Sequence, residues 1–390
     1  MIVGVPRESF PGERRVAMVP AVIPSLAKAG LDVVVEAGAG TEAGYPDSEF
    51  VAKGATILPT RAEVFAAADI IVQVLSNGAN DRTGQDDVPL YRPNQALIGF
   101  MRPLSALEPI QEIASKGVTA FSIELMPRTT RAQSMDALSS MATISGYKAV
   151  VTAADALPKI FPMLTTAAGT ITPARVFIIG CGVAGLQAIA TARRLGAVVS
   201  AYDLRPAVKE QVQSLGGRFV EIAVEAKDAQ DARGYATAQG EEFYKKQREL
   251  LGKVIAESDV VITAAVIPGK KSPILVTKEM VEGMAPGSVI VDLAAERGGN
   301  CELTRPGEKV EAHGVAIIGY INLASTVPYH ASQMYAKNVA TFLLYMVKEG
   351  KLQINPQDEI VRETLLTQGG EIVNARLREI YKLPALAAKS

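Results

Sequence analysis

Residues 174–205 read ARVFIIGCGVAGLQAIATARRLGAVVSAYDLR, and this stretch is the strongest indication of the fold. The apolar run Val176–Ile179 predicts a buried strand, and a GxGxxG pattern follows it directly. A helix rich in small residues is expected over Leu186–Leu195, and a second strand then ends in Asp203. This order of strand, glycine loop, helix, strand and acid is typical of a dinucleotide-binding domain. The alternative is a glycine-rich turn in a parallel sheet that holds no ligand.

Each glycine of the pattern has a separate physical role. Gly180 makes the tight turn, Gly182 lets the backbone approach a pyrophosphate, and Gly185 lets the helix pack closely on the strand. The N-terminus of the helix offers free N–H groups and the positive end of its dipole to the phosphates. The loop residues that we expect to contact a cofactor are Gly180, Cys181, Gly182, Val183 and Gly185.

The acid at the end of the second strand indicates which dinucleotide binds. Asp203 would accept hydrogen bonds from the adenosine ribose hydroxyls and would repel a 2′-phosphate, which favours NAD(H) over NADP(H). Arg205 lies just past the strand and could pair with such a phosphate, stack over the adenine or point to solvent. The sequence therefore predicts NAD(H), contacted here by Asp203, Leu204 and Arg205.

Composition limits the class of protein. A chain of 390 residues exceeds a single hydrophobic core, so two domains are expected. The net charge is −1 and no basic run occurs, which argues against nucleic acid as a partner. Two cysteines cannot form a disulfide framework, which is consistent with a reducing compartment. No metal site is expected. The nearly apolar stretch Val176–Ala192 contains three turn-forming glycines, so no segment is expected to span a membrane.

Short apolar strands alternate with helical stretches in both halves of the chain. In the second half we expect six strands, at Val176–Ile179, Val198–Tyr202, Arg218–Ile222, Val260–Ala264, Val289–Leu293 and Ala316–Ile318. This alternation predicts an α/β fold of two Rossmann-like domains, each a doubly wound parallel sheet with helices on both faces. The helical runs Met135–Ala154 and Ala331–Lys348 are the candidates for two crossings between the domains. We therefore expect a discontinuous first domain of residues 1–134 and 331–390, and an NAD(H)-binding domain of residues 135–330.

Two further segments suggest surface features. Pro162–Pro173 reads as a projecting β-hairpin, which indicates a homodimer contact; the alternative is an ordinary surface loop. Residues 225–247 form a long polar connection between two strands, which is typical of a functional lid; the alternative is a solvated helix tip.

The segment MPRTTRAQSMDALSS at residues 126–140 closely resembles domain I, the NAD(H)-binding component of proton-translocating NAD(P) transhydrogenase. The resemblance extends over nearly the whole chain, including GERRVAMVP (12–20), TAAGTITPARVFIIGCGVAG (166–185) and VIVDLAAERGGNCE (289–302). Alanine dehydrogenase shares much of the remainder, so residues 126–140 are the specific signal.

The resemblance implies roles for particular residues. Arg128, Gln133, Asp136 and Ser139 would surround the nicotinamide and its ribose, and Tyr235 would be the mobile-loop tyrosine that closes over the cofactor. The other positions that match NAD contacts are Gly182, Asp203 and Gly234 and, less securely, Gln247 and Val266. For residues 128–139 the alternative is an ordinary helix start, with Ser134 as the N-cap and an ion pair between Arg128 and Asp136.

The resemblance also implies an assembly. The family has the nucleotide in a cleft between two Rossmann-like domains and dimerises through a swapped hairpin. Its partners are domain III, which binds NADP(H), and a membrane-spanning domain II. NADP(H) is therefore not expected to bind to this chain. This chain would then be cytoplasmic, peripheral on the inner face of the cell membrane and held there by its partners.

An alanine-dehydrogenase-like amino-acid dehydrogenase is the alternative enzyme. Such an enzyme moves a proton on and off its substrate and needs a general acid or base. At the position of the catalytic histidine of the dehydrogenases, this chain has Arg102. Near the position of their substrate lysine, it has Gln73, Val74 and Leu75. An arginine that the dehydrogenases also carry is present here as Arg15, and Glu296 takes the place of one of their aspartates. Hydride transfer between two nicotinamides needs no such proton. A module that senses NAD without catalysis is a third class.

Overall fold

The computed structural model describes residues 1–221, 241–267, 269–384 and 386, and these form two compact units. Unit 1 comprises residues 1–141 and 325–390, and unit 2 comprises residues 142–324. The first division falls within helix α5 (Ala137–Ala156), and the second falls within the short 3-10 helix η8 (Leu323–Thr326). Each unit is built on one large sheet, so the predicted α/β fold with two sheets dominated by parallel strands is confirmed.

The sheet of unit 1 has eight strands in the order β19-β18-β6-β5-β4-β1-β2-β3. The strands are β1 Ile2–Val5, β2 Asp32–Glu36, β3 Thr56–Leu58, β4 Ile70–Leu75, β5 Ala96–Phe100, β6 Thr119–Ser122, β18 Leu365–Gln368 and β19 Glu371–Ile372. The first six are parallel, and β18 and β19 extend the edge beside β6 as antiparallel strands. The chain reverses its direction of travel across the sheet between β1 and β4, which defines the topological switch point of this unit.

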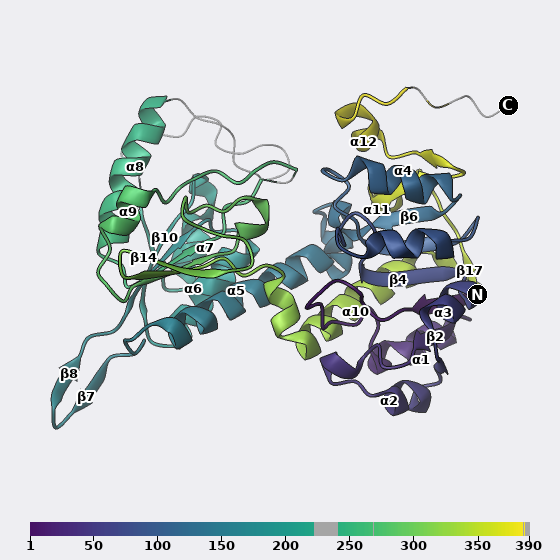
Figure 1. Cartoon of the computed structure of the whole chain (residues 1–390), viewed down its shortest axis with the longest axis horizontal. Helices are drawn as coiled ribbons and strands as arrows, with labels where there is room; N and C mark the ends of the chain where they lie inside the picture. The colour runs from purple at the N-terminus through teal and green to yellow at the C-terminus, as the bar shows by residue number, and fades with distance from the viewer. Residues whose placement is uncertain (222–240, 268, 385, 387–390) are drawn as a thin grey trace. The chain divides into compact units, whose positions relative to one another are not determined.

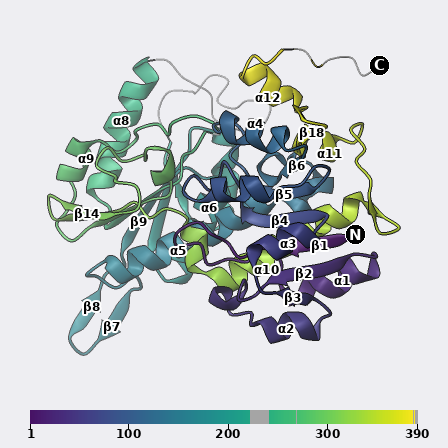
Figure 2. The same ribbon diagram turned by 45° about the vertical axis from the view of Figure 1, so that its right-hand side comes forward.

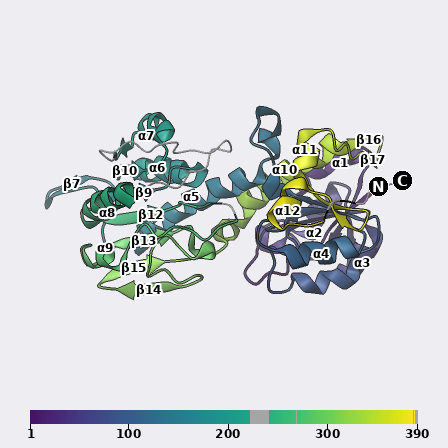
Figure 3. The same cartoon turned by 90° about the horizontal axis from the view of Figure 1, so that it is seen from above.

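Helices cover both faces of that sheet, with α1, α10 and α11 on one side and α3 and α4 on the other (Figure 3). The α-helices are α1 Ile23–Lys28, α2 Asp47–Ala52, α3 Arg61–Ala67, α4 Leu107–Ser115, α10 Pro328–Met346, α11 Glu359–Thr364 and α12 Ala375–Ile380. The 3-10 helices are η1 Pro20–Val22, η2 Thr41–Ala43, η3 Gly84–Leu90, η4 Ile123–Leu125 and η5 Thr130–Met135. A separate two-stranded sheet pairs β16 (Val347–Lys348) with β17 (Lys351–Leu352). Phe121 of the sheet packs edge-on against Phe342 of α10, with ring centroids 5.8 Å apart. The returning segment 325–390 therefore completes the core of unit 1.

The sheet of unit 2 has seven strands in the order β11-β10-β9-β12-β13-β15-β14. The strands are β9 Arg175–Ile179, β10 Val198–Tyr202, β11 Arg218–Phe219, β12 Val260–Thr263, β13 Val289–Asp292, β14 Lys309–Ala312 and β15 Val315–Ile318. Six are parallel and match the strands expected from the sequence, with Ile222 of the expected third strand outside the described residues. The antiparallel edge strand β14 was not expected, because its alternating pattern lies in a short polar run.

The helices of unit 2 also lie on both faces of its sheet. They are α6 Val183–Arg194, α7 Lys209–Ser214, α8 Glu241–Ala256 and α9 Lys278–Glu282, with the 3-10 helices η6 Pro206–Val208 and η7 Ala295–Arg297. One core cluster joins α5 and α6 to the sheet, and a second joins α8 and α9 to its opposite face. The described helices include none with the length and apolar character needed to cross a membrane.

The expected hairpin is present as β7 (Leu164–Thr166) paired antiparallel with β8 (Gly169–Ile171). It projects away from the rest of unit 2 in two views (Figures 1 and 2). All the residues of both strands are exposed, so none of them contributes to the core of the unit.

Candidate functional site

The glycine loop lies at the switch point of unit 2. The chain leaves β9 at Gly180 and later returns to β12, on the other side of β9 from β10. The Gly180 N–H donates to Tyr202 O at 2.8 Å, and the Ala264 N–H donates to Ile179 O at 2.7 Å, so the ends of the three strands are tied together. In doubly wound sheets this position, outside the carboxyl ends of the strands, is where ligands bind.

Two glycines of the loop have opposite surroundings. A methyl group on Gly185 would lie 1.9 Å from Gly180 O, so α6 can begin this close to β9 only without a side chain there. Gly180 itself has a left-handed φ of 95°, as the tight turn requires. A methyl group on Gly182, in contrast, would meet nothing within 4 Å among the described residues. No side chain among the described residues caps the N-terminus of α6, so its first N–H groups are uncapped. These N–H groups and the open space beside Gly182 suit a pyrophosphate.

Asp203 holds the loop in shape and is itself held by Arg205. Its carboxylate accepts the Cys181 N–H at 2.7 Å and the Arg205 N–H at 2.8 Å. The Arg205 guanidinium pairs with both carboxylate oxygens, each at 2.9 Å. The sequence left open a phosphate contact, stacking over the adenine or a solvent-facing side chain for Arg205; in the structure the side chain instead pairs with Asp203 and is only 17% exposed.

Cys181 contributes its backbone to this arrangement. Its side chain is buried in the core cluster beneath α6. Burial and the neighbouring Asp203 carboxylate raise the pKa of the Cys181 thiol well above its usual range. The thiol is therefore protonated and unreactive at neutral pH. Val183 and Leu204, the remaining members of the predicted contact set, are respectively exposed and half-buried.

Gln247 and Val266, two further predicted contacts in unit 2, differ in burial. Gln247, on α8, is buried and donates to Tyr202 OH at 2.9 Å, which links α8 to the end of β10. Val266 is half-buried in the loop after β12. Asn300 fixes this loop, because its amide accepts from Ala265 N at 3.0 Å and donates to Ala265 O at 2.9 Å.

The other predicted residues lie in unit 1, just before η5, on η5 and at the start of α5. Arg128 and Gln133 are exposed, and Asp136 and Ser139 are half-buried. Asp136 accepts the Ser139 N–H at 2.9 Å and the Ser139 hydroxyl at 2.5 Å, so it acts as the N-cap of α5. A helix start is thus present here as that alternative expected, but its cap is Asp136 and not Ser134. Gly234 and Tyr235 lie outside the described residues, as does most of the expected lid at 225–247.

Unit 1 has the same kind of switch point, but its own side chains fill it. Glu8, just after β1, accepts the N–H groups of Val74 at 2.6 Å and Leu75 at 3.0 Å at the end of β4. Beside it, Asn80 donates to the Ser9 hydroxyl at 3.0 Å. Burial and the nearby Glu13 raise the pKa of Glu8 to about 8, whereas the two N–H groups and Arg61 lower it. At neutral pH the Glu8 carboxyl group is therefore largely protonated, and it occupies the two backbone donors at the end of β4.

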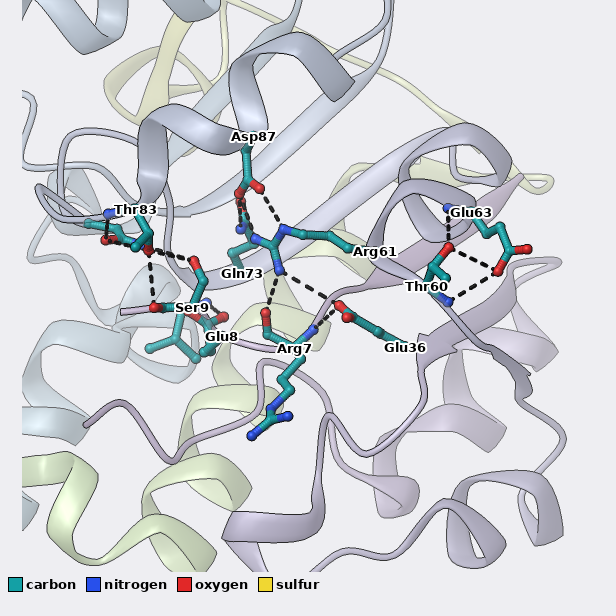
Figure 4. A network of polar contacts seen from close by, with 12 residues as sticks. Arg7, Glu8, Ser9, Glu36, Thr60, Arg61, Glu63, Gln73, Thr83 and Asp87 are labelled. Carbon is teal, nitrogen blue, oxygen red and sulfur yellow. Dashed lines mark hydrogen bonds and ion pairs between the residues drawn. The ribbon is translucent and has the colours of Figure 1, made fainter. Parts of the chain in front are cut away.

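Figure 4 shows how Arg61 extends this polar network along the loop that follows β1. Its guanidinium pairs with Asp87 at 2.5 and 2.6 Å, donates to Arg7 O at 2.5 Å and lies 3.7 Å from Glu36. Asp87 also accepts from the Gln73 amide at 2.8 Å. Every charged group of the network therefore has a partner inside unit 1.

The positions that correspond to substrate groups in the dehydrogenases are engaged internally. Arg15 forms a buried ion pair with Glu13 at 2.5 Å, and Gln73 is buried against Asp87. Arg102 has a left-handed φ of 48° and lies 3.6 Å from Asp81. At these described positions, no acid–base group takes the place of the missing histidine and lysine.

Glu296 is engaged as well, in unit 2. It accepts the Asn322 N–H at 2.6 Å. Asn300, Glu8 and Glu13 were not singled out from the sequence. A Gly-Gly-Asn run precedes Cys301, but a single amide or carboxylate has no local signature of burial.

Fold and site together define a two-unit α/β protein with a dinucleotide-binding glycine loop in unit 2. Residues 4–145 match the family model "Alanine dehydrogenase/PNT, N-terminal domain", and residues 149–375 match "Alanine dehydrogenase/PNT, C-terminal domain". The chain belongs to the alanine dehydrogenase/PNT family.

The most similar proteins include transhydrogenases. The chain is 47% identical over 380 residues to an NAD(P) transhydrogenase alpha-subunit protein of Rhodospirillum rubrum, covering 97% of this chain and 99% of that protein. The crystal structure of a transhydrogenase from Sinorhizobium meliloti superimposes with a TM-score of 0.85 at 47% identity, covering 96% of this chain and 100% of that one. An L-alanine dehydrogenase gives 0.81 at 25% identity, covering 98% and 99%. The resemblance inferred from residues 126–140 is confirmed.

Gly182→Ala should weaken NADH binding at least ~10-fold without unfolding unit 2, because the added methyl group enters the space proposed for the pyrophosphate. NADH titration and thermal unfolding together measure both effects. Gly252→Ala, on α8 with Met280 near the new methyl group, is the control and should keep its affinity. Unchanged NADH affinity in Gly182→Ala would exclude this loop as the phosphate site.

Glu8→Gln should remove a pH dependence of stability. With a pKa near 8 in the folded chain and 4.5 as its ordinary value, Glu8 binds more protons when folded, so its contribution to the free energy of unfolding falls as pH rises between those values. Each pKa unit corresponds to about 1.4 kcal/mol. The difference between wild-type and variant unfolding free energies should therefore decrease from pH 5 to pH 8. Glu42→Gln, the same change on an exposed side chain, is the control. Parallel stability curves would contradict the shift.

Proposed function

We propose that this chain is the NAD(H)-binding domain I of a proton-translocating NAD(P) transhydrogenase. The observation that carries the proposal is 47% identity along nearly the full length of both chains with a transhydrogenase alpha-subunit protein. An intact glycine loop with an acid at the end of β10 supports NAD(H) as its cofactor. The NADP(H) would be carried by a partner domain III, and proton translocation by a membrane-spanning domain II.

The engaged polar groups of unit 1 support hydride transfer between nucleotides over amino-acid oxidation. Bound NADH supplies a hydride from C4 of its nicotinamide, and this step moves no substrate proton. Arg15 and Gln73 are held by Glu13 and Asp87, which leaves them poorly placed to bind a keto acid, and neither side chain is a general acid at neutral pH. Arg128, Gln133, Asp136 and Ser139 orient the nicotinamide end in this proposal, and exposed Gln133 is its contact with the partner domain.

Alanine dehydrogenase activity is the second candidate, because an L-alanine dehydrogenase superimposes over nearly the whole chain with a TM-score of 0.81. The two candidates differ in the hydride acceptor. A transhydrogenase domain I passes the hydride to NADP⁺ on another protein, whereas the dehydrogenase uses pyruvate and ammonia.

The test mixes this protein with NADP⁺-loaded domain III and NADH carrying deuterium at C4. Deuterium should appear in NADPH, because the transfer is direct, and mass spectrometry measures it. Almost no NADH should be consumed by pyruvate and ammonia. Turnover with pyruvate and ammonia, together with no transfer to the partner domain, would reverse the assignment.

We also propose that the chain forms a homodimer through its hairpin. Met163, Leu164 and Ile171 are 63%, 44% and 49% exposed, which is unusual for apolar side chains gathered on one projection. Next to them is a largely apolar groove of about 700 Å³. Its lining includes Leu157, Pro158, Ile160, Phe161 and Leu195. A second copy of the hairpin would cover this surface.

Leu164→Asp combined with Ile171→Asp should convert the dimer to a monomer, because charges would replace the apolar contact. Sedimentation velocity measures the change. Val51→Asp, at a side chain 56% exposed in unit 1, should remain dimeric. A wild type that sediments as a monomer, or a hairpin variant that stays dimeric, would contradict this contact.

A further inference from the structure

The exposed residues proposed to orient the nicotinamide sit on and beside a short 3-10 helix. Within η5, Ala132 and Met135 are buried while Gln133 and Ser134 are exposed. In a 3-10 helix, residues three apart lie on one face, so this pattern docks a single face of η5 on unit 1. Hydrogen-bond geometry in 3-10 helices is poor, so a six-residue helix of this kind needs outside support to keep one conformation.

One support is a cluster of Arg131, Tyr345 and Asp358. Arg131 Nη2 lies 3.1 Å from Asp358 Oδ2, and Tyr345 OH donates to the same oxygen at 2.6 Å. The guanidinium carbon also lies 5.9 Å from the centroid of the Tyr345 ring, within cation–π range. The cluster therefore joins η5 to α10 and to the start of α11.

Asp358 is a fixed point in this cluster. Its second oxygen accepts from Ile360 N at 2.9 Å and Val361 N at 3.4 Å, which caps α11. Desolvation raises the pKa of Asp358. The hydrogen bonds from Tyr345 and from the two backbone N–H groups lower it, as does the charge of Arg131, and the net pKa is lowered. The carboxylate is therefore ionised at neutral pH and able to hold the guanidinium.

A second support lies about two turns earlier on α10. Asn338 Nδ2 donates to Ser134 O at 2.9 Å, and the Asn338 side chain is buried. Ser134 follows Gln133 directly, so this hydrogen bond fixes the backbone next to an exposed residue of the proposed site. The two supports hold η5 near its two ends, at Arg131 and Ser134.

We propose that Arg131, Asn338, Tyr345 and Asp358 are positioning residues for hydride transfer, which hold η5 so that Arg128 and Gln133 present the nicotinamide in one geometry. This inference rests on the proposed function. In this arrangement the four side chains act through η5 and do not touch the nucleotide. A misplacement of about 1 Å at a reacting centre costs up to ~100-fold in rate. Loosening η5 should therefore slow transfer, while the adenosine and pyrophosphate contacts of unit 2 preserve affinity.

The experiment measures single-turnover deuteride transfer to NADP⁺-loaded domain III and, separately, NADH affinity. Arg131→Leu and Asn338→Leu should each slow transfer about 10-fold, with the dissociation constant for NADH changed less than ~2-fold. Arg131→Lys keeps the charge but loses the planar fork, and it should restore part of the rate. Asp358→Asn keeps an oxygen to cap α11, so a slower rate in this variant reports the lost hold on Arg131.

Arg82→Leu is the matched control, because Arg82 lies in unit 1 with its side chain 70% exposed beside Asp81 and outside the cluster. It should transfer at the wild-type rate. Hydrogen exchange of the amides of residues 130–136, measured without nucleotide, should increase in Arg131→Leu and Asn338→Leu but not in the control. This readout reports the hold on η5 directly.

Wild-type transfer rates in Arg131→Leu and Asn338→Leu would overturn the inference, as would equal losses of rate and affinity. If the wild-type protein itself transfers no deuterium, the proposed function fails. In that case unchanged exchange in the variants would also overturn the anchoring of η5, and increased exchange would support it. The two failures are therefore distinguishable.

Discussion

The close approach of α6 to the end of β9 is the contact on which the arrangement of unit 2 depends. A methyl group on Gly185 would lie 1.9 Å from Gly180 O, so this approach requires a glycine. Because the helix begins directly at the strand, its N-terminal turn stands at the switch point, beside the open space at Gly182. Asp203 then fixes the intervening loop through the Cys181 N–H. The result is a preformed pocket edge of N–H donors, which suits an anionic ligand.

Unit 1 shows that the same strand order does not by itself create a nucleotide site. Its first six strands follow the order of the six parallel strands in unit 2, yet the donors at its switch point are taken by Glu8. The buried Glu8 carboxyl group, Arg61 and the Glu13–Arg15 pair make this end of the sheet a closed polar network. The function of a fold therefore follows from the groups at its strand ends, and topology alone is an insufficient guide.

The polar groups of unit 1 divide into those with internal partners and those on its surface. Arg15 and Gln73 are buried and held by acids, whereas Gln133 is exposed on a helix that is anchored from α10. In the proposed hydride transfer the second reactant is bound to another protein, and an exposed, anchored residue suits such a step because it requires orientation of the two reactants. The hairpin of unit 2 provides a separate apolar surface, built from exposed strands that project from the rest of the unit.

The order of residues along the chain was sufficient to predict the α/β class, the six parallel strands of unit 2, the glycine loop with Asp203, and the hairpin. These features depend on local periodicity and on backbone conformations that particular residues allow, so neighbours in the sequence report them. Three other features became visible only in the folded chain: Arg205 lies on Asp203, Glu8 fills the switch point of unit 1, and Asn338 holds Ser134. The last two features join residues that are distant in the chain. The sequence around a buried amide or carboxyl group does not indicate its partner, because the packing of the elements determines which groups meet.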